Sequence, residues 1–525
     1  MRAYMEQQAV LTRPTRPEEQ KNTSSDNFRW MRHFFTEDVS PDNRPLIDLQ
    51  RRATWIGIAC VLQAIDQIDS GWYLQFLPFL KPIVHIYPVF LILGSFFAMW
   101  QALRPAKQKK QVLHLRRHLQ RWQRFALILI VLTSIAGAFE FGTAVVLSFM
   151  PPQYSNDGTS LDANAVALLL QGRNPYTESN IVHLVREFPI QPDWTTPLRK
   201  GQFAGSLIYP SPVEMRTVLD TDLKAGNAPE FESKVSYPAL SFLSLLPLVG
   251  LGIYNVLIFY FLCYLVLVGI AWKLVRSELR PWVLLLGLAN VGMLSSVAGG
   301  NLDILNILLI VFAWLLRDRK WSSAVFLGLA VATKQPSWLL VPFYAIMTWR
   351  HYDFKEAVRR LTIAGVVALV INLPFILWDP HAWLSGVLAP VIDPMFPLGD
   401  GIISLSFASF IPFFPTWVYD VLEVTTMFLC LAWYWRVCKK RPEAAILFAF
   451  MPLFFAWRSL PSYFYCSAYP LFILLTSKGW PGLGGQPRKA VELSFSYDRP
   501  VMGNIAVSVG VPSAMPFPGM IRSLR

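Results

Sequence analysis

Long hydrophobic runs constrain what this chain can fold into more than any other feature of its sequence. Several extend over about 18–25 residues, the length that an α-helix needs to cross the hydrocarbon core of a bilayer. Hydrophobic residues make up 54% of the 525 positions and charged residues only 15%, whereas soluble domains carry about 25% charged residues. The sequence therefore predicts an all-α fold, a polytopic bundle of transmembrane helices.

The hydrophobic runs divide into about twelve expected spans, two of them short half-spans, with both termini on the cytoplasmic side. Residues 321–349 should form the two half-spans, because both flanks are basic and Lys334-Gln335-Pro336 interrupts the run. Residues 237–251 and 402–414 are short, and we expect re-entrant segments there. The other expected spans are 55–72, 82–103, 125–150, 254–275, 282–298, 304–316, 361–378, 416–437, 444–457 and 462–476.

The net charge of +13 is concentrated in short connections between these runs. Residues 104–124 hold eight Lys or Arg and no acid, and further basic groups lie at 317–320, 350–360 and 439–441. Basic connections of this kind mark the cytoplasmic side of a membrane protein, so they do not indicate a nucleic-acid-binding surface. We expect a plasma-membrane protein in which the long loop 151–236 is extracytoplasmic.

Four parts are expected along the chain. Residues 1–52 would be a cytoplasmic N-terminal segment, and residues 53–124 an additional transmembrane hairpin with its basic connector. Residues 125–477 would form the core, including the loop 151–236, and residues 478–525 a cytoplasmic tail. The five cysteines lie in or beside apolar runs without metal-ligand spacing, which is typical of small core residues.

The loop 151–236 contains the sequence LDANAVALLLQGRNPY at 161–176. Thr159 or Ser160 should cap a short helix that ends at Gly172, because glycine tolerates the left-handed backbone of a helix C-terminus. Pro175 should then fix a turn over 173–176. This interpretation puts Asp162 in the first turn of the helix, and a second helix is expected around 178–188.

The order of an acidic residue, a short apolar helix and G-x-N-P-Y resembles the first extracytoplasmic loop of GT-C membrane glycosyltransferases. The most similar family is glycosyltransferase family 87, the polyprenol-phosphate-mannose-dependent mannosyltransferases, and the resemblance covers residues 125–475. It implies a GT-C-like transmembrane core in which the acidic residue of the loop is the catalytic base. It also implies a polyprenyl-phosphate sugar as the donor, with mannose expected from the resemblance alone.

Transfer of a sugar from a phosphate needs a base for the acceptor hydroxyl and positive charge for the departing phosphate. Asp162 is the expected base; the alternative is that it completes a capping box begun by Thr159. Asp157 is the second candidate. His381, in DPHAW, is a third catalytic candidate because histidine side chains commonly act in proton transfer, although most single loop histidines have no such role.

Lys334 is the leading candidate for binding the phosphate, because a lysine between two apolar helices is costly unless it is paired. The alternative is a lysine that reaches the lipid headgroups. Arg458, beside a predicted helix break, would bind phosphate or sugar, or else anchor the chain at the membrane interface. Asn301 and Asp303 would bind sugar hydroxyls or a cation, or form a solvated turn.

The turn residues Arg173, Asn174 and Tyr176 complete the expected substrate-binding set. The predicted function is inverting transfer of a sugar from a lipid-linked donor to a glycolipid, glycan or protein acceptor at the outer membrane surface. No cofactor and no metal site are expected. A transporter or lipid flippase is the alternative, with Lys334 in its substrate pathway; a single Lys-Pro break without a partner in another half argues against it.

Overall fold

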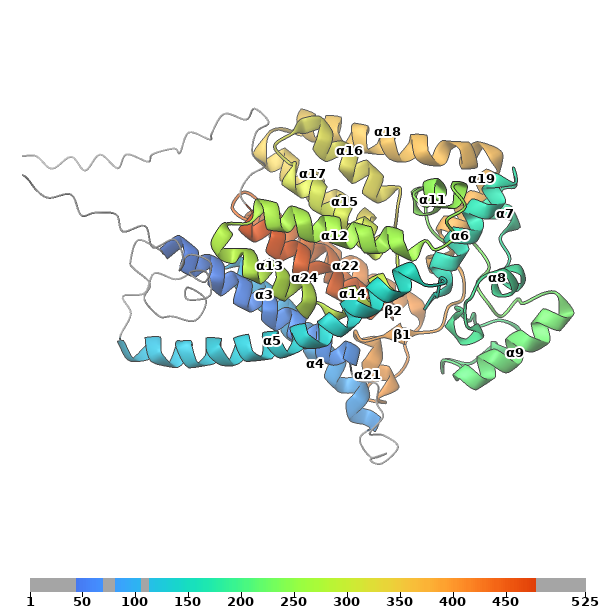
Figure 1. Ribbon diagram of the computed structural model, residues 1–525, viewed down its shortest axis with the longest axis horizontal. Helices are drawn as coiled ribbons and strands as arrows, with labels where there is room; N and C mark the ends of the chain where they lie inside the picture. The colour runs from blue at the N-terminus through green and yellow to red at the C-terminus, as the bar shows by residue number, and fades with distance from the viewer. Residues whose placement is uncertain (1–43, 69–80, 105–112, 478–525) are drawn as a thin grey trace, which may run out of the picture. The chain divides into compact units, whose positions relative to one another are not determined.

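The structure is a computed structural model that describes residues 44–68, 81–104 and 113–477. Helices dominate these residues, as Figure 1 shows, and the all-α prediction is confirmed. Two short strands, β1 (Leu398–Gly399) and β2 (Arg458–Ser459), pair in parallel within the described part. The predicted cytoplasmic tail and most of the predicted N-terminal segment lie outside the described residues.

Four described helices contain stretches that are long and apolar enough to cross a membrane. They are α4 (Lys81–Leu103), α5 (Leu113–Phe149), α12 (Leu257–Leu274) and α18 (Phe354–Trp378). The remaining predicted spans form helices that are shorter, less apolar or broken. A membrane protein is therefore supported, while the number of about twelve spans, two of them half-spans, remains a prediction.

Three described helices differ from the predicted spans. Helix α3 (Arg44–Ile68) begins before the predicted span 55–72, so residues 44–52 of the predicted N-terminal segment are helical. Helix α5 begins at Leu113, so the second half of the predicted basic connector 104–124 is helical as well. The expected span 282–298 bends by 60° between α13 (Arg280–Ala289) and α14 (Val291–Ala298), where the side chain of Asn290 caps the second helix.

The predicted break at Lys334-Gln335-Pro336 is present. Helix α16 (Lys320–Val331) ends before it, and α17 (Pro336–His351) begins at the proline, which can occupy a first helical turn but not a helix interior. Residues 237–251 form only the short helices α10 (Leu240–Leu243) and α11 (Leu246–Gly250). Neither is long enough to cross a bilayer, as expected.

The C-terminal part of the bundle follows the predicted order. Residues 402–414 contain only the short α21 (Ile403–Phe407), and α22 (Thr416–Val437) has the predicted bounds. The expected span 444–457 is divided into α23 (Ala444–Phe450) and the 3-10 helix η8 (Pro452–Phe455). Helix α24 (Pro461–Thr476) then closes the core, packing on α3, α15 (Asp303–Leu315) and α23.

Helix α5 approaches α13 very closely. A Cβ atom at Gly137 would lie 1.7 Å from the carbonyl oxygen of Leu288, so only glycine fits there. One turn away, the Ser134 hydroxyl donates a hydrogen bond to the Leu285 carbonyl oxygen at 3.0 Å. Small residues that allow close helix approach, together with interhelical hydrogen bonds, are typical of packing inside membranes.

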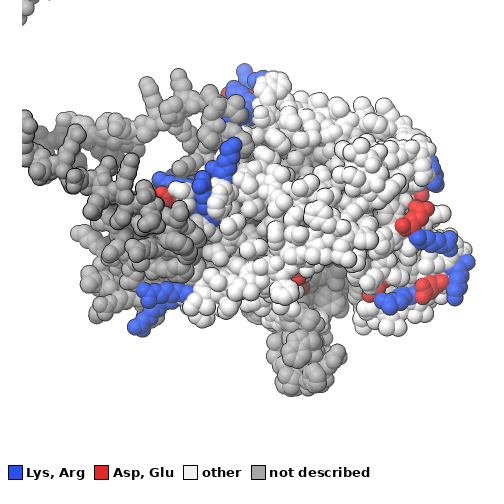
Figure 2. All heavy atoms as spheres, viewed as in Figure 1, with Lys and Arg blue, Asp and Glu red and all other residues white. Residues whose placement is uncertain are grey.

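A second layer covers one end of the bundle. It consists of α6 (Asp157–Leu170), α7 (Pro175–Glu178), α8 (Ile181–Glu187) and α9 (Pro212–Ala225), with their own small hydrophobic cluster around Ile181, Leu184 and Leu219. The face in Figure 2 carries its described charged side chains mainly at two ends, with a broad uncharged surface between them. Such a division is expected where a hydrophobic belt meets lipid.

Candidate active site

Helix α6 carries both acidic candidates, and it begins earlier than predicted. The side chain of Asn156 accepts a hydrogen bond from the Thr159 amide at 3.1 Å, so Asn156 is the N-cap and Asp157 the first helical residue. Asp162 consequently lies in the second turn. The prediction that Thr159 or Ser160 caps the helix is wrong. A capping box between Thr159 and Asp162 is absent too, because both residues lie inside the helix. Gly172, at φ 73°, follows the helix end as predicted.

Asp162 is completely buried, and its two oxygens have different surroundings. Oδ1 accepts a hydrogen bond from the Ser241 hydroxyl at 2.7 Å, whereas Oδ2 has no hydrogen-bond partner among the described residues. Burial raises the pKa of Asp162 to about 7, although the Ser241 hydrogen bond and the charge of Lys334 lower it. A carboxyl group with this pKa and one unused oxygen is suited to accept a proton near neutral pH.

Lys334 lies in the break between α16 and α17, next to Asn301 and Asp303 at the start of α15. Its Nζ is 2.5 Å from Asp303 Oδ1 and 3.4 Å from Asn301 Oδ1. The same nitrogen lies 5.1 Å from the centre of the Tyr237 ring. The side chains of Lys334 and Asp303 are both only 7% exposed, so this lysine does not reach headgroups. The sequence-predicted residues Lys334, Asn301 and Asp303 are thus brought together.

The Tyr237 ring lies near both the Lys334–Asp303 ion pair and Asp162. Burial raises the pKa of Tyr237 to about 12; the charge of Lys334 lowers it, and those of Asp303 and Asp162 raise it further. All three charged groups therefore lie near one aromatic ring. The result is a buried cluster with two carboxyl groups and one ammonium group, in which Asp303 Oδ2 also lacks a described hydrogen-bond partner.

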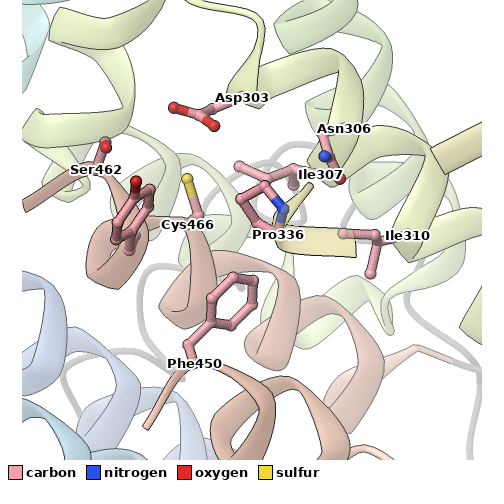
Figure 3. A pocket seen from close by; sticks show the side chains of 9 residues that line it. Asp303, Asn306, Ile307, Ile310, Pro336, Phe450, Ser462 and Cys466 are labelled. Atoms are coloured by element: carbon pink, nitrogen blue, oxygen red, sulfur yellow. The ribbon is translucent and has the colours of Figure 1, made fainter. Parts of the chain in front are cut away.

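A small cavity opens beside Asp303, and Figure 3 shows its polar residues on one side and Phe450 on the opposite side. Asp162 and Lys334 are not among its lining residues. The cavity is lined by Asp303, Asn306, Ile307, Ile310, Pro336, Phe450, Ser462, Tyr463 and Cys466.

Residues 236–461 match the model of glycosyltransferase family 87. This match confirms the resemblance predicted from the sequence and supports a membrane glycosyltransferase; it lends no support to a transporter. The matched residues include Ser241, Asn301, Asp303, Lys334 and Arg458. Asp162 and the G-x-N-P-Y turn lie outside them. No curated protein and no solved structure matches the chain.

Arg458, the other cation predicted to bind the donor, also lies within the region that matches glycosyltransferase family 87. It belongs to β2 and is half-buried, and its guanidinium contacts the sulfur of Met395. None of the ion pairs in the described part of the chain involves it, in contrast to Lys334. Its positive charge lowers the pKa values of Asp157 and Tyr209, so it lies near the N-terminus of α6.

Asp157 holds a loop in place. Its Oδ2 accepts a hydrogen bond from the Thr196 amide at 2.8 Å, and its Oδ1 one from the Thr196 hydroxyl at 3.3 Å. Burial raises the pKa of Asp157, while these hydrogen bonds and Arg458 lower it. Since both oxygens already have partners, Asp157 is less available than Asp162 to accept a proton from a substrate.

The G-x-N-P-Y turn contacts Tyr237, the aromatic residue of the buried cluster of Asp162, Asp303 and Lys334. Asn174 accepts a hydrogen bond from the Tyr176 amide at 3.1 Å and so caps α7. The buried Tyr176 donates its hydroxyl hydrogen to the Tyr237 carbonyl oxygen at 2.8 Å, and its ring packs on Phe242. The turn therefore positions Tyr237, the residue beneath Lys334.

Two predicted residues lie at the surface. Arg173 forms an exposed ion pair with Glu178, with 2.6 Å between Nε and Oε2. His381 is exposed in the first turn of α19 (Pro380–Val387), a helix that packs on α7 and α18. Sequence reasoning also missed Ser241 and the role of Tyr237. Nothing in the sequence around Ser241 distinguishes it from Ser244, one turn later.

Proposed function

We propose that this protein transfers a sugar from a polyprenyl-phosphate donor to a hydroxyl group of a lipid, glycan or protein acceptor. The observation that carries the proposal is the buried Asp162, whose Oδ2 has no described partner, beside the Lys334–Asp303 pair of a chain that matches glycosyltransferase family 87. Mannose is the proposed sugar, on the basis of the family resemblance predicted from the sequence.

The proposed reaction is a direct displacement with Asp162 as the general base. Asp162 Oδ2 removes the proton from the acceptor hydroxyl as its oxygen forms a bond to the anomeric carbon. The bond between that carbon and the phosphate oxygen breaks, and the prenyl phosphate leaves with the bonding electrons. A single displacement inverts the anomeric centre, so a β-linked donor gives an α-linked product. No step is assigned to a metal ion.

Lys334 and Arg458 would stabilise the departing phosphate. Arg458 has no described carboxylate partner to displace. Lys334 already forms an ion pair with Asp303, so a phosphate oxygen would compete with that carboxylate for the ammonium group. Asn301 and Asp303 would then be available to sugar hydroxyls. Because these roles depend on charge, neutral replacements should weaken donor binding as well as transfer.

The proposal requires the α6–α9 layer to face the extracytoplasmic side, which cysteine labelling can test. All five native cysteines are buried, so the background should be low. A membrane-impermeant thiol reagent should label Asp220→Cys, on the exposed face of α9, and should not label Lys439→Cys in intact cells. Labelling only of Lys439→Cys would reverse the orientation.

The function itself is tested with the full chain in vesicles. Radiolabelled polyprenyl-phosphate mannose and glucose are supplied with membrane lipid and glycan acceptors, and the anomeric configuration of the product is determined by NMR. Wild-type protein should transfer label with inversion, whereas Asp162→Asn should bind the donor without transferring it. The proposal fails if the wild-type protein binds none of the polyprenyl-phosphate sugars supplied.

A further inference from the structure

The hydrogen bond between Ser241 and Asp162 links two segments that are far apart in the sequence. Ser241 Oγ donates to Asp162 Oδ1 at 2.7 Å, and both side chains have no exposed surface. A hydrogen bond shielded from water in this way is stronger than one at the surface, because no solvent competes with it. It occupies one carboxylate oxygen and leaves Oδ2 as the one without a described partner.

The backbone around Ser241 is anchored to other parts of the core. The Leu240 amide donates a hydrogen bond to the Ala332 carbonyl oxygen at 3.0 Å, in the break that also carries Lys334. The Ala239 amide donates to the Asn372 side chain of α18 at 2.9 Å. Ser241 therefore cannot shift independently of the α16–α17 break, and its hydroxyl ties the position of Asp162 to that break.

We propose that Ser241 is a positioning residue for the base: its hydroxyl fixes the rotamer of Asp162 and selects Oδ2 as the oxygen that accepts the acceptor's proton. This inference rests on the proposed function. It adds to that function a residue that touches neither sugar nor phosphate and acts through Asp162.

Other groups also influence Asp162, and they remain unchanged when Ser241 is replaced. The ionisable groups near it on neighbouring segments are Lys334, Tyr176, Tyr237 and Tyr260. Helices α10 and α11 carry none, and α8 exposes its ionisable residues, which are His183, Arg186 and Glu187. Because the Ser241 hydrogen bond stabilises the carboxylate form, its loss should raise the pKa of Asp162.

The test compares the pH dependence of kcat/KM for sugar transfer in four proteins. The acid limb is the part of the pH profile in which kcat/KM falls as Asp162 becomes protonated. In Ser241→Ala this limb should move up by about one pH unit, so that transfer below neutral pH falls about tenfold. Ser241→Thr keeps the hydroxyl and should restore the wild-type limb. Ser244→Ala is the matched control, since the Ser244 hydroxyl donates to the Ser241 carbonyl oxygen at 2.8 Å and not to Asp162. Donor binding should be unchanged in all four.

An acid limb of Ser241→Ala that coincides with the wild-type limb, in a protein that binds donor normally, would overturn the inference. If Ser241→Ala does not fold, Ser241→Cys replaces it, because a thiol fills similar space but donates only a weak hydrogen bond; an unshifted limb there has the same meaning. The proposed function fails separately, through absence of wild-type transfer or full activity of Asp162→Asn.

Discussion

The first and second turns of α6 carry two buried acids with opposite surroundings. Asp157 lies at the helix N-terminus, where unpaired amides favour negative charge, and both of its oxygens accept hydrogen bonds from Thr196. Asp162, five residues later, has one bond from Ser241 and an oxygen without a described partner. Burial raises the pKa of both, yet only Asp162 keeps an acceptor site open. Satisfaction of hydrogen bonds, more than burial, therefore separates a structural acid from a reactive one.

The largest expected difference between the two turns is in sugar transfer. Asp162→Asn preserves the shape of the side chain but removes the base, so transfer should fall about 10²–10⁴-fold. Asp157→Asn keeps one acceptor oxygen for Thr196 and should lose less than about tenfold, because it takes no part in proton transfer. Both rates are measured with the same radiolabelled donor. The opposite order would identify Asp157 as the base.

A smaller effect is expected for the cation beside Asp162. Lys334→Met removes a charge that we propose to bind phosphate, so donor affinity should fall about 10–100-fold. Because Asp303 would be left buried and unpaired, the double variant with Asp303→Asn keeps the core neutral. The control is Lys234→Met, which removes another paired lysine, 2.6 Å from Asp393, in the segment that follows α9. Wild-type donor affinity in the double variant would exclude Lys334 from the phosphate site.

The smallest expected effect is on stability. The pKa of Asp162 rises from 3.8 to about 7 on folding, so the folded state binds more protons between these values. Stability contributed by this group is present at low pH and is lost as pH rises through about 7. Asp162→Asn has no carboxyl group to ionise, so its stability does not fall in this way as the pH rises. At pH 8 its Tm should be at least that of the wild type, and higher by up to about 1–3 °C.

Asp157→Asn should instead lower Tm, since an amide is a poorer partner for the Thr196 amide and hydroxyl than a carboxylate. Thermal unfolding in detergent at pH 5 and pH 8 measures both variants. A Tm of Asp162→Asn that is clearly below wild type at pH 8 would mean that the carboxylate of Asp162 stabilises the fold, as a structural acid does.

Local signals in the sequence were sufficient for much of the fold. Pro336 cannot continue the hydrogen bonding of α16, and basic residues flank both ends of the run, so the break at Lys334 follows from local chemistry. Gly172 and Pro175 similarly determine where α6 ends and α7 begins. The start of α6 was misjudged because Asn156, Thr159 and Ser160 are all suitable caps, and the choice among them depends on contacts outside the helix.

The sequence by itself determined that this chain forms apolar helices and has a broken one with a lysine at the break, because hydropathy and proline act over a few residues. Only the tertiary structure decided that Lys334 pairs with Asp303, and that Ser241 instead of Ser244 donates to Asp162. These contacts join residues 31 and 79 positions apart, and each depends on the rotation and depth of two packed elements. A pattern of residue types specifies which groups need partners; the packing of α6 and the α16–α17 break against α10 specifies which partners they find.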